Sequence, residues 1–230
     1  MKRSIFKLFI FLSLVVAGCD NADDLLNQHI QGGPIVYAGK INQIETQSGY
    51  HRVRVNIYPA ADVNRDRFVL RWSVNNAAKD SVVVMYNDDN YDADIDGWFT
   101  VIDLPGVEGN LLIEAQNFDR FDNPSLLSTQ GAFIYGENYI NTLLNAPVSF
   151  TEDGSQALFE SRVGVVGNLV SYELAGGQFT EPVFTNAESL LLAAYKPGGI
   201  LRSKTVYRMN GSDFDTLSHP EFLETQLPNL

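Results

Sequence analysis

The chain has 230 residues, and its 28 Asp and Glu residues outnumber its 16 Lys and Arg residues to give a formal net charge of −12. Phosphate binding depends on clustered Lys and Arg, so this acidic balance argues against a nucleic-acid partner. Hydrophobic residues make up 45% and aromatic residues 11% of the chain, which excludes a disordered protein and suits one large domain or two small ones.

A basic N-terminus precedes an apolar run from Leu8 to Ala17. This run is too short for a transmembrane helix, which needs about 20 apolar residues. It has the length of the apolar part of a secretory signal peptide. We therefore predict a cleaved signal peptide over residues 1–18.

Cys19 is the only cysteine, and it follows the small residues Ala17 and Gly18. The pattern VAGC resembles the lipobox of bacterial lipoproteins, in which the thiol receives a diacylglyceryl group. The alternative is a spare thiol beside an ordinary signal peptide. The resemblance implies lipidation of Cys19 and stable attachment to a membrane, because such a cysteine carries two or three acyl chains. The expected location is the cell envelope, as an outer-membrane lipoprotein.

Residues 19–33 form an acidic segment that ends at Gly32 and Gly33 and is typical of a flexible tether. Its aspartates resemble the surface-export signals of Bacteroidota lipoproteins, which would place the protein on the cell surface. A solvated tether without that role is the equal alternative. Removal of residues 1–18 leaves 13 basic residues against 28 acidic ones, a net charge of −15.

Residues 34–134 are predicted to form a first β-sandwich. Apolar and polar residues alternate in YHRVRVNIY and DRFVLRW, which is typical of half-buried strands. The predicted inward residues are Val53, Val55, Ile57, Phe68, Leu70 and Trp72. SVVVMY is a continuous β-branched run, and it predicts a strand near the centre of a sheet. Two further strands are expected in WFTVIDL and NLLIEAQNF, the second with Leu111, Ile113 and Ala115 on one face.

The stretch DLPGVEGNLLIEAQNFDRFDNPSLLS resembles the last third of a fibronectin type III domain. In such a domain a Leu-x-x-Gly turn leads into a strand, and an Asp-rich turn and a Ser then open the final strand. Leu111 stands where such domains often have a tyrosine, so the hydrogen bond of that corner is expected to be absent.

The second half is predicted to contain a linker or short helix over residues 135–145 and a second sandwich over residues 146–230. Its expected strands lie in ALFESRVGVV, LVSYEL and TVYRM. A Pro-Gly-Gly turn at 197–199 precedes TVYRM. The fold class is therefore all-β, with two tandem sandwiches that could be a degenerate repeat.

The mature chain also resembles an uncharacterised family of Bacteroidota envelope lipoproteins with tandem fibronectin type III or immunoglobulin-like domains. VYAGK, GYHRVRV, FVLRWSVNNAAKDSVVV and YGENYINTLLNAPV carry this resemblance. Such proteins are often encoded beside glycan-uptake systems. The resemblance implies a glycan or an outer-membrane transport protein as partner, and it brings no activity with it.

No catalytic residue is predicted. The three histidines, His29, His51 and His219, are scattered along the chain, whereas a hydrolase triad needs a base beside a nucleophile. His51 is expected to face solvent on a strand. Because a glycosidase needs only two carboxylates, a glycan-active enzyme remains the third alternative.

One acidic stretch has the spacing of a calcium-binding loop. Asp92, Asp94 and Asp96 precede Gly97, and Asp103 occupies the twelfth position, as in an EF-hand. The flanking residues are predicted to be strands rather than the helices of an EF-hand, so a polar hairpin without metal is the alternative. Calcium is the only cofactor that the sequence suggests.

Tyr86, Tyr91 and Trp98 frame the same loop. Aromatic rings there would stack on sugar rings, or they would form part of the sandwich core. The predicted function is a non-catalytic, lipid-anchored envelope protein that binds a glycan or an outer-membrane partner. The alternative is a structural spacer or adhesin without its own ligand.

Overall fold

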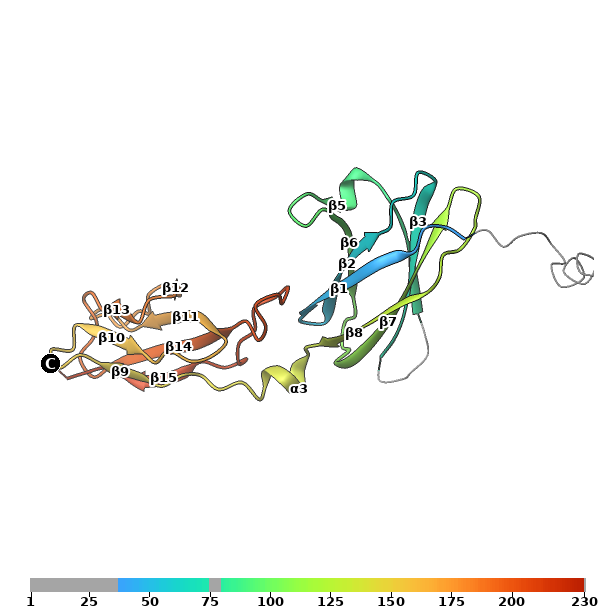
Figure 1. Cartoon of the computed structure of the whole chain (residues 1–230). Helices are drawn as coiled ribbons and strands as arrows, with labels where there is room; N and C mark the ends of the chain where they lie inside the picture. Colours follow the sequence, from blue (N-terminus) through green and yellow to red (C-terminus); the bar gives the residue numbers. More distant parts are fainter. Residues whose placement is uncertain (1–36, 75–79, 230) are drawn as a thin grey trace, which may run out of the picture. The chain divides into compact units, whose positions relative to one another are not determined.

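The computed structural model describes residues 37–74 and 80–229 (Figure 1). The predicted signal peptide, Cys19 and the tether lie outside these residues. Within the described part, no helix is both long and apolar enough to cross a membrane. Almost all of the regular structure consists of antiparallel strands, which confirms the predicted fold class.

The first sandwich contains eight strands and one 3-10 helix, η1. They are β1 (Ile41–Gly49), β2 (Arg52–Pro59), β3 (Arg65–Val74), β4 (Asp80–Met85), η1 (Asp88–Asn90), β5 (Tyr91–Asp92), β6 (Gly97–Asp103), β7 (Gly109–Asp119) and β8 (Ser128–Ile134). One sheet has the order β1-β2-β6-β5 and the other β4-β3-β7-β8. In strand letters this is A-B-E-D against C′-C-F-G, the arrangement of immunoglobulin-like and fibronectin type III sandwiches.

The second sandwich contains seven strands, most of them short. They are β9 (Val148–Phe150), β10 (Gln156–Phe159), β11 (Val165–Tyr172), β12 (Val183–Thr185), β13 (Ser189–Leu191), β14 (Ile200–Tyr207) and β15 (Leu223–Gln226). The sheets have the orders β13-β10-β9 and β12-β11-β14-β15. In the same strand letters, these sheets are E-B-A and C′-C-F-G. The two halves therefore share one strand order despite their different sequences.

The cores of the two sandwiches differ in size. Alternate residues of β2, β3 and β7 point between the sheets of the first sandwich, and the predicted inward residues, including Val53, Phe68 and Ile113, are buried as expected. The second sandwich buries only six hydrophobic residues in its main cluster. Polar residues occupy part of its interior instead, among them Asn168 and Thr205.

A short helix, α3 (Glu137–Ile140), lies between the last strand of the first sandwich and β9. Tyr135 and Leu143 from this connection pack with Tyr207 and Leu217 in a small buried cluster. The backbone N–H of Ala146 also donates a 2.7 Å hydrogen bond to the hydroxyl of Thr205 on β14. The connection is thus tied to the second sandwich by both apolar and polar contacts.

Strand β4 lies at a sheet edge, so the predicted central position of SVVVMY was wrong. Val82 and Val84 pack against the core, whereas Val83 is 59% exposed. A continuous apolar run therefore did not mean burial on both faces. The β-branched residues suit an edge strand equally well, because strand propensity does not report position in a sheet.

Three local expectations also need correction. Tyr50 and His51 form the turn between β1 and β2 rather than strand, and His51 adopts a left-handed conformation with φ of 55°. Asn56, expected on the outer face, is 2% exposed, and its side chain accepts a hydrogen bond from Arg54. ALFESRVGVV is not one strand, since β10 ends at Phe159 and β11 begins at Val165.

Candidate functional site

The acidic stretch forms a hairpin between β5 and β6, in which Asp92 is opposite Gly97. Asp92 forms an ion pair with Arg54 on β2, which is separated from β5 by β6 in the sheet. The other oxygen of Asp92 accepts a 3.0 Å hydrogen bond from the N–H of Asp94. The Arg54 guanidinium holds the pKa of the Asp92 carboxyl below its usual value. Asp92 therefore has partners within the protein that stabilise its charge.

The other predicted calcium ligands do not gather around Asp92. Asp96 accepts a 2.6 Å hydrogen bond from the hydroxyl of Tyr91. Asp103 is at the far end of β6, six residues from Gly97, or about 20 Å along the strand. Asp103 therefore cannot share an ion with Asp92. In the described part of the chain, no three His, Cys, Asp or Glu side chains are grouped so that they could hold a metal.

The three predicted aromatic residues do come together. The ring centroid of Trp98 lies 5.1 Å from that of Tyr86, at an interplanar angle of 87°, and 5.0 Å from that of Tyr91. Tyr86 and Trp98 also pack against the sandwich core, whereas Tyr91 is exposed. Tyr86 and Trp98 thus extend the core outwards, as one of the two predicted roles requires, and Tyr91 presents a ring to solvent. Stacking on a sugar stays a prediction.

Local structure holds these rings in place. Asn87 and Asn90 cap η1 reciprocally, each side-chain oxygen accepting the other residue's N–H at 3.2 Å, and this fixes the path from Tyr86 to Tyr91. Asp96 has φ of 50°, a conformation that Asp tolerates better than most residues. The turn it makes returns the chain so that Trp98 lies opposite Tyr91.

Arg65, at the start of β3, completes the cluster. Its guanidinium lies 4.3 Å from the ring centroid of Trp98 and 4.9 Å from that of Tyr86. Among the described residues, no carboxylate pairs with Arg65, so these rings are the contacts of its charge. Arg65 and the three rings border a pocket of about 610 Å³, which we call the aromatic pocket; Asp62, Val63, Asn87, Asp88 and Asp96 complete its lining.

The carboxylates of the aromatic pocket differ in their freedom to bind a ligand. Asp62 accepts hydrogen bonds from the backbone N–H groups of Gly39 and Asn64, both at 2.8 Å, and so holds the local fold. Asp96 has one oxygen engaged by Tyr91. Asp88 is exposed and has no partner among the described residues. Asp88 and Asp96 therefore offer acceptors, Arg65 offers donors, and Tyr91 offers a flat apolar face.

The pattern of the sequence indicated the rings but not Arg65, Asp62 or Asp88. Arg65 is the first residue of β3, distant in sequence from the tyrosines, and only the folding of the chain brings it to Trp98. The hydroxyl of Tyr86 donates a 2.6 Å hydrogen bond to Asn117 on β7, and burial raises the pKa of Tyr86, so this phenol stays protonated. No local sequence signal indicated either contact.

Two sandwiches with the strand order of immunoglobulin-like and fibronectin type III domains, the first with a pocket at its surface, define a tandem β-sandwich protein. The chain belongs to the family of the domain of unknown function DUF4998, whose family model matches residues 19–216. No curated protein matches the sequence.

Several solved structures are similar to this chain at low identity. A two-domain fibronectin type III segment from chicken tenascin is 15% identical, with a TM-score of 0.33, over 81% of this chain and 99% of that one. The FN1–FN3 domains of chicken CNTN1 are 12% identical, with a TM-score of 0.37, over 85% of this chain and 68% of that one. A family 76 glycoside hydrolase from a bovine Bacteroides thetaiotaomicron strain is 17% identical, with a TM-score of 0.34, over 41% of this chain but only 20% of the hydrolase.

Proposed function

We propose that this protein is a non-catalytic glycan-binding module and that the aromatic pocket is its binding site. The observation that carries the proposal is the convergence of Tyr91, Trp98 and Arg65 on one pocket, next to the open carboxylate oxygens of Asp88 and Asp96. A volume of about 610 Å³ lies in the range of small-ligand sites.

The chemistry of this lining suits a hydroxyl-rich ring. The apolar face of a sugar covers an exposed aromatic side chain, and planar charged side chains make paired hydrogen bonds to neighbouring hydroxyls. In the aromatic pocket Tyr91 provides the exposed ring, while Arg65 covers much of Trp98. Trp98 therefore supports the site, and Tyr91 is the residue that stacks on the sugar.

The proposal is tested by presenting the mature chain to a panel of neutral oligosaccharides and measuring the affinity of any that bind by calorimetry. Tyr91→Ala is expected to weaken binding about tenfold or more, as loss of a stacking platform of about 1.4 kcal/mol would do. Tyr91→Phe keeps the ring and loses the hydroxyl that contacts Asp96. It should retain most of the affinity if stacking dominates.

Phe121→Ala is the control, because Phe121 is a 65% exposed aromatic residue outside the pocket lining. Equal losses in Phe121→Ala and Tyr91→Ala would indicate non-specific binding. If no neutral oligosaccharide binds, the proposal is wrong. The structural spacer, which needs no ligand, then becomes the better account.

The lipid anchor on Cys19 remains part of this proposal, supported by the residues 16–19, VAGC. Anchoring would hold the binding module at the envelope, where glycans and outer-membrane transport proteins are available as partners. Cys19→Ser should move the protein from the membrane fraction to the soluble fraction. Unchanged partitioning, or no incorporation of a labelled fatty acid by the wild type, would contradict it.

A further inference from the structure

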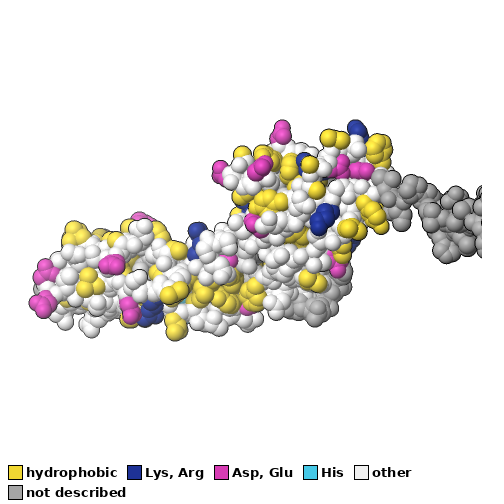
Figure 2. All heavy atoms as spheres, viewed as in Figure 1, with side chains coloured by type: hydrophobic (Ala, Val, Ile, Leu, Met, Phe, Trp, Pro, Cys, Tyr) yellow, Lys and Arg dark blue, Asp and Glu magenta, His cyan; other side chains and the backbone are white. Residues whose placement is uncertain are grey.

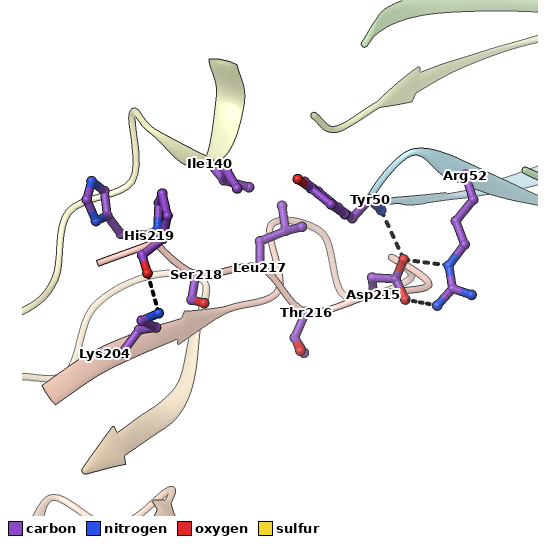
Figure 3. A pocket seen from close by; sticks show the side chains of 10 residues that line it. Tyr50, Arg52, Ile140, Lys204, Asp215, Thr216, Leu217, Ser218 and His219 are labelled. Carbon is purple, nitrogen blue, oxygen red and sulfur yellow. Dashed lines mark hydrogen bonds and ion pairs between the residues drawn. The ribbon is translucent and has the colours of Figure 1, made fainter. Parts of the chain in front are cut away.

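A second pocket of about 610 Å³ lies outside the aromatic pocket, and its chemistry is different (Figure 3). It is lined by Tyr50 and Arg52 of the first sandwich, by Ile140 at the end of α3, and by Lys204 and residues 215–220 of the second sandwich. The segment 215–220 runs along the pocket between Arg52 and Lys204 in Figure 3. We call this the basic pocket.

The one carboxylate that lines the basic pocket is already neutralised. One oxygen of Asp215 accepts hydrogen bonds from Nε of Arg52 and from the N–H of Tyr50, both at 2.9 Å, and the other accepts from Nη2 of Arg52. Both oxygens are thus occupied, and the Arg52 guanidinium holds the pKa of Asp215 below its usual value. Asp215 therefore offers little to repel an anion.

The hydroxyl of Tyr50 is engaged, since it donates its proton to the carboxylate of Glu137. Four other side chains of the basic pocket, those of Lys204, His219, Thr216 and Ser218, can donate hydrogen bonds. Lys204 gives one N–H to the carbonyl of Pro220 at 2.6 Å and has no carboxylate partner among the described residues. An ammonium has three donors, so two remain. Nδ1 of His219 accepts from the N–H of Glu221 at 3.0 Å, which leaves Nε2–H to donate. Within the described residues, the hydroxyls of Thr216 and Ser218 have no hydrogen-bond partner.

Arg52 adds further donors, since only two of its five N–H groups are engaged by Asp215 and its side chain is 41% exposed. This concentration of donors is unusual for a chain of net charge −12. On the face in Figure 2, Lys and Arg side chains stand apart from one another among acidic and neutral ones. The basic pocket is therefore a local exception to the charge of the chain.

We propose that the basic pocket binds an oxyanion, the carboxylate or sulfate of an acidic sugar or a phosphate group, with Lys204 as the main charged contact. Hydrogen bonds from a cationic donor to an anionic oxygen are the strongest that a protein makes in a solvated pocket. The volume of the pocket accommodates a sugar ring that bears the anion. Ser218 and Thr216 then hydrogen-bond the anion or neighbouring hydroxyls.

Calorimetry with the mature chain tests this, using trigalacturonate, maltotriose, inorganic sulfate and inorganic phosphate as probes. Wild type is expected to bind an anionic probe at millimolar concentration, and Lys204→Gln is expected to weaken that binding about tenfold. Ser218→Ala should weaken it less. Lys196→Gln is the matched control, because Lys196 is paired with Glu173 in the same sandwich and lies outside the pocket.

The measurement is repeated with Tyr91→Ala, so that binding at the aromatic pocket does not enter the result. Preference for trigalacturonate over inorganic ions identifies an acidic sugar, whereas equal affinity identifies the oxyanion alone. Absence of binding by every anionic probe overturns the proposal. It is also overturned if Lys204→Gln binds as wild type does, or if Lys196→Gln loses affinity equally while both variants keep the wild-type melting temperature.

Discussion

Two residues on β14 show how much a single buried hydroxyl depends on its partners. Thr205 and Ser203 are both buried, two positions apart on the same face of the strand. The hydroxyl of Thr205 accepts from Ala146 N–H and donates to the side-chain oxygen of Asn168. The hydroxyl of Ser203 is the only buried side-chain polar atom in the described residues without a hydrogen-bond partner.

Opposite responses are therefore expected from removing the two hydroxyls. Thr205→Val leaves two buried groups without a partner and should destabilise the protein by about 1–3 kcal/mol. Ser203→Ala removes an unsatisfied group, so stability should be unchanged or slightly increased. Thermal unfolding of the two variants and the wild type measures this difference. A loss in Ser203→Ala as large as in Thr205→Val would mean that a bound water satisfies Ser203.

At the scale of elements, the β5–β6 hairpin shows that ligand spacing along a chain is not ligand geometry. The EF-hand pattern places its twelfth residue beside the first because the loop curls around the ion. Here the residues after Gly97 continue as the extended strand β6, which carries Asp103 away from Asp92. The carboxylate of Asp92 instead pairs with Arg54 and a backbone N–H, and that of Asp96 accepts a hydrogen bond from the Tyr91 hydroxyl.

Calcium is accordingly expected to leave the stability of the hairpin unchanged. An extracellular calcium site would have a Kd of about 10⁻⁴ to 10⁻³ M. Calcium at one hundred times Kd would then stabilise the folded protein by about 2.7 kcal/mol. We expect the same melting temperature in about 10 mM calcium, one hundred times the lower of these Kd values, and in chelator. A rise in calcium that is lost in Asp94→Ala would restore the predicted calcium site, because Asp94 contributes only its backbone N–H to the present structure.

The Arg54–Asp92 pair is expected to stabilise the same hairpin. Arg54 lies over the ring of Phe99 at 4.1 Å and also donates to Asn56, so its position does not depend on Asp92 alone. Asp92→Asn should therefore lower the melting temperature only slightly, and Arg54→Ala should lower it more. Equal losses would mean that the ion pair, rather than the packing of the arginine, provides the stability.

At the scale of the whole molecule, the segment 213–215 contacts the first sandwich and the connection that follows it through several bonds. Asp215 binds Arg52 and Tyr50, the N–H of Phe214 donates to the carbonyl of Ser48 at 2.8 Å, and Asp213 accepts from the hydroxyl of Tyr135 at 2.9 Å. Residues 34–134 and 146–230 remain proposed as separate domains. These bonds predict that either range, expressed alone, is less stable than the same range in the full chain.

The Asp215 contact predicts a specific dependence of stability on pH. Because Arg52 lowers the pKa of Asp215 in the folded protein, the carboxylate stabilises the fold fully above its unfolded pKa of about 3.9. That contribution is lost as the pH falls through the lower folded pKa. Asp215→Asn should therefore melt below wild type at pH 7, with a smaller gap in strong acid. A gap that stays constant with pH would show that the charge of Asp215 does not contribute.

The pattern of residues along the chain was sufficient to predict the fold class and most of the first core. Period-2 alternation places residues such as Val55 and Leu70 on one face wherever a strand forms, because successive side chains point to opposite sides. It also identified Tyr86, Tyr91 and Trp98 as candidate ligand contacts, since they flank one short loop. These inferences needed only local geometry, which the chain carries in its own pattern.

Which strands are edges, and which side chains share a pocket, depended on the packing of the folded chain. The residue pattern of β4 is compatible with a central or an edge position in the sheet. β4 is an edge strand because β3 is the one described strand with which it pairs. Arg65 reaches Trp98, and Lys204 reaches the same pocket as Arg52, through folding that joins residues more than thirty positions apart. Such contacts leave no local signal, because they depend on the packing of sheets rather than on the order of residues.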